Sequence, residues 1–150
     1  MKVKKVNQYQ CEFCGKKQYS VGHMRKHEKH CTMNPNRYCR MCEFIEVDQV
    51  DIPTLLGILP NPKDYLNKNL EYESYDGLEE ALKKPVESLR TMTNGCPVCM
   101  MAALRQKGIY LTMVKDRFDF EAECKEIFVR IRDEEYERER EADYIRMVMG

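Results

Sequence analysis

The sequence predicts a mainly α-helical fold with a small β component, and two observations support this. The stretch 116–150 carries apolar residues at 4-3-4 spacing and then a charged run rich in possible i,i+4 pairs, which is typical of a long helix. Six of the eight cysteines stand in three CxxC pairs. Such closely spaced pairs are more typical of zinc sites than of disulfides in a reducing compartment. We therefore expect the fold to be stabilised by zinc.

A first ligand pattern lies near the amino terminus. Cys11 and Cys14 are followed after twelve residues by His27, and Cys31 comes four residues later. Residues four apart on a helix project from one face, so His27 and Cys31 can complete a tetrahedron begun by the CxxC turn. His30 is a rival fourth ligand, although its spacing from His27 fits less well. The segment 9–31 resembles the classical zinc-finger family in its variant with a final cysteine, which implies a ββα fold.

A second pattern combines the two remaining pairs. Cys39 and Cys42 are separated by 53 residues from Cys96 and Cys99, which open a predicted helix ending at Gly108. The pairs resemble a split treble-clef or ribbon-like four-cysteine zinc site, which gives two zinc ions in all. Sites completed by a partner chain, reduced cysteines and an iron–sulfur cluster are the alternatives. The combination of finger, split pairs and charged tail also resembles small zinc-finger proteins encoded by phages.

The chain is expected to have three parts. They are a basic lead-in with the finger at 1–36, a four-cysteine zinc domain at 37–115 with a helical insertion at 43–95, and a charged carboxy-terminal helix at 116–150. Pro85 is expected to kink or split a helix that runs to about Thr91, and residues 109–114 alternate weakly enough to suggest a strand. A small core is expected from Leu55, Leu56, Ile58, Leu59, Leu78, Leu82, Val86 and Leu89.

Charge divides the chain and indicates an anionic partner. The formal net charge is zero, yet residues 1–40 hold ten Lys or Arg against two Glu, a net of +8, and the remainder is correspondingly acidic. We expect this basic segment to bind nucleic acid, DNA rather than RNA. Seven residues are assigned to nucleic-acid contacts, either with phosphates or, at the helix positions that face bases in the finger family, with bases. They are Lys16, Lys17, Ser20, His23, Arg25, Lys26 and Lys29.

Other function classes are disfavoured. Both zinc sites have four protein ligands, which leaves no open position for a substrate, so we expect no enzyme and no small-molecule substrate. No apolar run approaches the length of a membrane span, and the first residues lack the apolar segment of a signal peptide, so a cytoplasmic location is expected, in the host if phage-encoded. The alternative function is a non-catalytic protein-interaction module of a larger assembly, with the carboxy-terminal helix contacting a protein.

Overall fold

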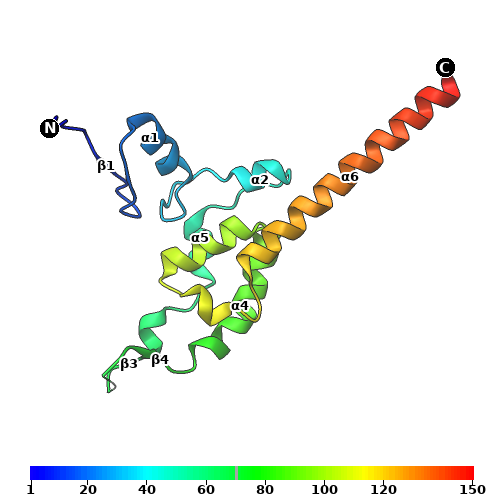
Figure 1. The fold of residues 1–150 in the computed structure, drawn as a ribbon. Coiled ribbons are helices and arrows are strands. Elements are labelled where there is room, and N and C mark those ends of the chain that lie inside the picture. Colours follow the sequence, from blue (N-terminus) through cyan, green and yellow to red (C-terminus); the bar gives the residue numbers. More distant parts are fainter. Residues whose placement is uncertain (70) are drawn as a thin grey trace. The chain divides into compact units, whose positions relative to one another are not determined.

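The computed structural model describes residues 1–69 and 71–150. It divides into two compact units, Met1–Phe118 and Asp119–Gly150 (Figure 1). Helices dominate both units, and the strands found in the described residues form two short hairpins. The predicted mainly α fold with a small β component is therefore confirmed.

The first unit begins with a β-hairpin and a helix, which we call the ββα unit (residues 9–31). Strand β1 (Tyr9–Gln10) pairs antiparallel with β2 (Lys17–Gln18). Helix α1 (Val21–His30) begins after Ser20, whose Oγ accepts a hydrogen bond from the amide of His23 and so caps the helix. Its small core joins two cysteines to apolar side chains: Cys11, Met24 and Cys31, with Tyr9 and Met33 packed against them.

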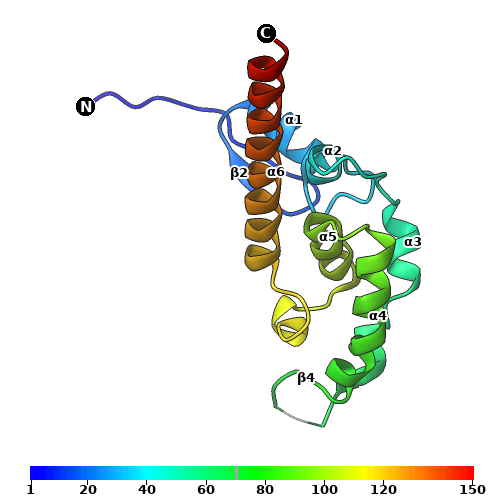
Figure 2. The same cartoon turned by 90° about the vertical axis from the view of Figure 1, so that its right-hand side faces the viewer.

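Helix α5 (Pro97–Lys107) is the centre of the helical body that follows. It contacts α3 (Ile52–Gly57) and α4 (Leu78–Met92), and both views show the three helices close together (Figures 1 and 2). Gly108 ends α5 with φ of 82°, a left-handed conformation that glycine adopts without strain. The fully buried side chains include Ile52, Leu55, Leu78, Leu82, Val86, Leu89, Met100 and Leu104. Of the predicted core, Leu56 and Ile58 are only half-buried.

One local prediction was wrong, and one of the two alternatives expected at Pro85 is excluded. The segment expected as a strand instead forms the 3₁₀ helix η2 (Leu111–Val114), which contacts α4 and α5. Burial of Ile109 and Val114 against these helices overrides the weak alternation, and no strand pairs with the segment in the described part of the chain. Pro85 does not split α4, which continues through it. The insertion also holds η1 (Pro62–Tyr65) and a hairpin of β3 (Leu66–Asn67) and β4 (Ser74–Tyr75).

The second unit is helix α6 (Phe120–Met149). The side chain of Asp119 caps it by accepting a hydrogen bond from the amide of Ala122 at 3.0 Å. The helix begins four residues later than position 116. Short-range ion pairs such as Arg146–Asp143 lie along it, with the two side chains 3.2 Å apart and exposed. Within the described residues, neither α6 nor any other helix has the length and apolarity that crossing a membrane requires.

Candidate zinc centres and a basic groove

The first metal centre lies between the β-hairpin and α1. Its potential ligand atoms come from Cys11, Cys14, His27 and Cys31, and all lie within 4.8 Å of one another. The Cys14 Sγ and His27 Nε2 are 3.2 Å apart, close to the separation of about 3.6 Å expected for sulfur and nitrogen bound to one tetrahedral zinc. The donor set of three thiols and one imidazole fits zinc, so these residues would hold the first ion.

The cysteines at this centre differ in pKa when no metal is bound. Burial raises the pKa of Cys14, but hydrogen bonds from the Lys16 backbone and from neighbouring side chains, His27 first, lower it overall to about 7. Burial raises the pKa of Cys31 to about 11. A zinc ion displaces the remaining protons and converts the cluster to thiolates. The rival ligand His30 lies outside the cluster, because its Nδ1 is 2.9 Å from the carbonyl oxygen of Tyr38.

The second metal centre joins two segments far apart in the chain. Cys39 is the N-cap of the short helix α2 (Arg40–Phe44), and Cys96 is the N-cap of α5. The Sγ atoms of Cys39 and Cys96 are 3.6 Å apart, and those of Cys42 and Cys99 are 3.5 Å apart. A disulfide would place two sulfurs about 2.05 Å apart, whereas tetrahedral zinc thiolates are separated by about 3.8 Å. The four buried cysteines therefore fit one zinc ion, as predicted.

Four cysteine side chains packed this closely share protons unevenly when no metal is bound. Hydrogen bonds from the other three cysteines, Cys42 first, hold the pKa of Cys39 far below its usual range. Contacts with the other three cysteines, Cys39 first, raise the pKa of Cys42. Contacts with Cys39 and then Cys96 raise the pKa of Cys99, although its contact with Cys42 lowers it. The cluster thus favours a mixture of thiols and thiolates without metal, and zinc binding permits four thiolates to coexist.

Arg37 is a buried cation beside the second centre, and no sequence pattern indicates this role. The residue is 4% exposed, and its guanidinium donates a hydrogen bond to the Cys99 Sγ at 3.5 Å. Although burial opposes its charge, the nearby Cys39 and Cys99 thiolates raise its pKa. Gln49 fixes the same segment, since it accepts from the Cys39 amide at 2.6 Å and donates to the Arg37 carbonyl oxygen at 2.7 Å. The permanent charge of Arg37 reduces the net charge of a zinc tetrathiolate from −2 to −1.

The ββα unit is fastened to the body by side chains of α5. The Arg105 guanidinium donates to Thr32 Oγ1 at 2.6 Å, and Gln106 Nε2 donates to the carbonyl oxygens of Thr32 and Asn34 at 2.8 and 3.1 Å. The Asn34 side-chain amide in turn donates to the Glu28 carbonyl oxygen in α1. One helix therefore carries two ligands of the second centre at its start and holds the first centre near its end.

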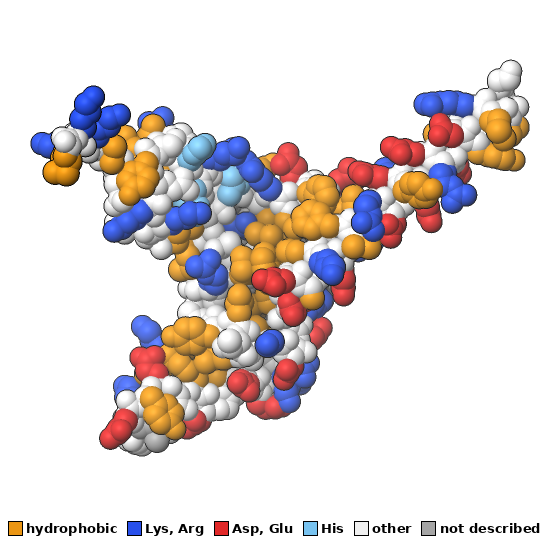
Figure 3. All heavy atoms as spheres, in the orientation of Figure 1, with side chains coloured by type: hydrophobic (Ala, Val, Ile, Leu, Met, Phe, Trp, Pro, Cys, Tyr) orange, Lys and Arg blue, Asp and Glu red, His pale blue; other side chains and the backbone are white. Residues whose placement is uncertain are grey.

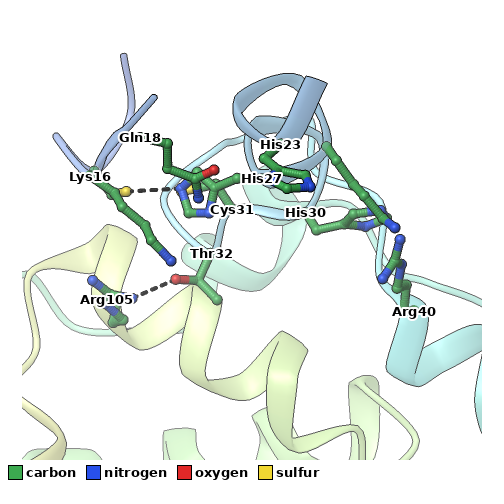
Figure 4. A pocket seen from close by; sticks show the side chains of 11 residues that line it. Lys16, Gln18, His23, His27, His30, Cys31, Thr32, Arg40 and Arg105 are labelled. Carbon is green, nitrogen blue, oxygen red and sulfur yellow. Dashed lines mark hydrogen bonds between the residues drawn. The ribbon is translucent and has the colours of Figure 1, made fainter. Parts of the chain in front are cut away.

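A groove of about 590 Å³ opens beside the first centre, and we call it the basic groove. Figure 4 shows Lys16 and Arg105 on one side, Arg40 on the other, and the ligands His27 and Cys31 between them. No Asp or Glu belongs to its lining within the described residues. The lining consists of Cys14, Lys16, Gln18, His23, Lys26, His27, His30, Cys31, Thr32, Arg40 and Arg105.

The groove contains some of the predicted nucleic-acid residues and omits others. Lys16, His23 and Lys26 line it. Four others lie outside its lining: Lys17, Ser20, Arg25 and Lys29. The Lys29 ammonium lies 5.1 Å from the ring centroid of Tyr38, and the Ser20 hydroxyl caps α1. Sequence patterns did not identify Arg40 and Arg105 as groove residues, because only the tertiary fold brings their helices beside the groove.

No protein-family model, curated protein or solved structure matches the chain. The two metal centres and the basic groove are therefore interpreted from their own geometry.

Proposed function

We propose that the protein binds nucleic acid through the basic groove and that its two zinc ions are structural. The observation that carries this proposal is the convergence of Lys16, Lys26, Arg40 and Arg105 on one groove. Three thiolates and a neutral histidine around zinc contribute one negative charge, so four cations leave a local net charge of +3. An anion is the ligand that this charge attracts.

Phosphate groups suit the geometry of the groove. Two of its cations are arginines, whose planar guanidinium groups can donate two hydrogen bonds to one phosphate. Arg105 is held in place by Thr32, so less side-chain freedom is lost on binding. The ion pairs in the described part of the chain lie on α4 and α6 and involve none of the four groove cations. On the face drawn in Figure 3, Lys, Arg and His side chains gather over the ββα unit, as expected for a phosphate-binding surface.

The ββα unit is proposed to be a zinc finger of the classical type with cysteine as its last ligand, and the second centre to be a treble-clef or ribbon-like site. Each zinc has four protein ligands, which leaves no coordination position for water or substrate. We therefore propose a structural role for both ions and no catalytic activity. DNA is the proposed ligand in preference to RNA.

The proposal is tested with the full chain, loaded with zinc, and a labelled DNA oligonucleotide. Lys26→Ala and Arg105→Ala should each weaken binding and flatten the dependence of log K on log salt by about 0.7 to 0.9 units per lost phosphate contact. Lys125→Ala removes an exposed lysine of α6 and should change neither quantity. Equal effects of the groove and control variants would contradict a role for the groove, and absence of binding would contradict the proposed function.

A protein partner for α6 is a second candidate function. Five apolar side chains near the end of the helix are exposed: Tyr144 at 63%, Ile145 at 49%, Met147 at 75%, Val148 at 62% and Met149 at 83%. Exposed apolar clusters of this kind are typical of interaction surfaces. Deletion of residues 133–150 should abolish such a contact without loss of zinc.

A further inference from the structure

We propose that the basic groove takes a single strand, with one base in the adjoining apolar pocket beside Tyr110. The inference rests on the proposed nucleic-acid function and specifies the form of the ligand. It starts from the position of His23 and Lys26, the two helix residues whose place in α1 suits base contacts. Both face the groove whose other walls include Arg40 of α2 and Arg105 of α5.

This arrangement disfavours a duplex. A helix reads bases by entering a major groove about 12 Å wide, with the flanking phosphates on both sides of it. Here Arg40 of α2 and Arg105 of α5 line the same groove as His23 and Lys26 of α1, so we infer that a duplex entering this groove would meet side chains of the body. A single strand has no second backbone to accommodate and can lie along such a groove.

An apolar pocket shares the lining residue Arg105 with the basic groove. It has a volume of about 410 Å³ and is lined by Met33, Arg105, Gly108, Ile109, Tyr110 and Leu111. Arg105 lines both cavities, so a phosphate bound to it would lie next to the apolar pocket. The volume falls within the range of about 300 to 1,000 Å³ that is usual for small-ligand pockets. A nucleobase adjacent to that phosphate is uncharged and would lie at the apolar pocket, so it suits the pocket in polarity and in position.

Tyr110 supplies the surface on which a base can stack. Its side chain is 55% exposed, and its ring meets that of Tyr75 edge-on, with centroids 6.3 Å apart and an interplanar angle of 66°. Tyr75 thus supports the ring while a large part of it stays accessible. On the face drawn in Figure 3, hydrophobic side chains gather around β4 and the segment after α5. A cationic groove beside an exposed aromatic ring is the combination by which proteins bind single strands without reading sequence.

The test compares four labelled ligands on the zinc-loaded full chain by fluorescence anisotropy. They are a twelve-nucleotide thymidine strand, the matching uridine strand, a twelve-base-pair duplex and a twelve-unit abasic strand with the same phosphates. We expect the thymidine strand to bind more tightly than the duplex, and the abasic strand to bind about 5- to 150-fold more weakly, the range for loss of one stacked base. The uridine strand differs from the thymidine strand in its 2′-hydroxyl and its missing base methyl, and weaker binding of it would support the proposed preference for DNA over RNA.

Variants locate the stacking site. Tyr110→Ala should weaken binding of the thymidine strand about 5-fold or more and leave the abasic strand unchanged, whereas Tyr110→Phe should retain the wild-type affinity. Tyr136→Ala is the matched control, because Tyr136 is 61% exposed on α6. Zinc content and circular dichroism establish that each variant is folded.

Three results would overturn the inference. They are tighter binding of the duplex, equal binding of the abasic and thymidine strands, or no effect of Tyr110→Ala. Each of them leaves phosphate binding in the groove intact. Failure of all four ligands to bind would instead refute the proposed function itself.

Discussion

Replacing Arg37 with methionine should selectively weaken the second zinc centre. The guanidinium is buried 3.5 Å from the Cys99 Sγ, and at an effective dielectric constant of about 20 two unit charges at this distance interact by about 5 kcal/mol. Removing one partner of a buried charge pair typically costs about 3 to 5 kcal/mol. Burial of the guanidinium itself carries a desolvation cost, and removing the guanidinium relieves that cost, which offsets part of the loss. We therefore expect zinc affinity to fall by about 10- to 100-fold, the usual range for loss of a residue that contacts metal ligands.

The assay is a chelator competition in which the zinc retained per chain is measured by elemental analysis. Wild-type protein should hold two zinc ions, and Arg37→Met should release one of them at a lower chelator concentration. Arg37→Lys keeps the charge with fewer fixed donors and should be intermediate. Arg40→Met is the matched control, because Arg40 is exposed in α2 and lines the basic groove. It should weaken nucleic-acid binding while zinc retention stays unchanged. Unchanged zinc retention in Arg37→Met would refute the charge-compensation argument.

Three further predictions concern the zinc ions and α6. Cys96→Ser should leave one tightly bound zinc and lower the thermal stability of the body, because Cys96 ties α5 to the cysteine pair at the start of α2. Two retained zinc ions would contradict the second centre. Cys14→Ser should unfold mainly the ββα unit, whose core is too small to be stable without metal, and proton NMR should show dispersion lost only for its residues. Deleting residues 133–150 should preserve both zinc ions and the melting temperature, because they belong to a separate compact unit; a lowered melting temperature would show that this part of α6 stabilises the body.

Local spacing made much of the fold and both ligand sets predictable. The four-residue step from His27 to Cys31 places both donors on one helix face, which is a property of helix geometry alone. Ser20, Asp51 and Gly108 are at helix ends where their own chemistry favours them. The pairing of distant CxxC units followed from counting ligands, since each pair supplies half of a tetrahedron.

The remaining features depend on tertiary contacts that no local pattern encodes. Arg105 meets Thr32 across 73 residues of sequence, and Arg37 meets Cys99 across 62, so neither role leaves a signal in its own segment. The predicted strand failed for the same reason, because packing on α4 and α5 decided the conformation of η2. The sequence Asp76-Gly77-Leu78-Glu79 matches a capping box, but this motif does not form. Gly77 is the N-cap of α4, and Asp76 instead accepts hydrogen bonds from Asn67 and Ser74.

Nucleic-acid binding through the basic groove is tested most directly by the salt dependence of affinity for a single-stranded oligonucleotide. Lys16, Lys26, Arg40 and Arg105 offer four phosphate contacts, each contributing about −0.7 to the slope of log K against log salt on a single strand. We expect a slope of about −3 for the wild-type chain, reduced by about 0.7 in Arg105→Ala. No binding at about 50 mM salt, or a slope near zero, would contradict phosphate recognition by the groove.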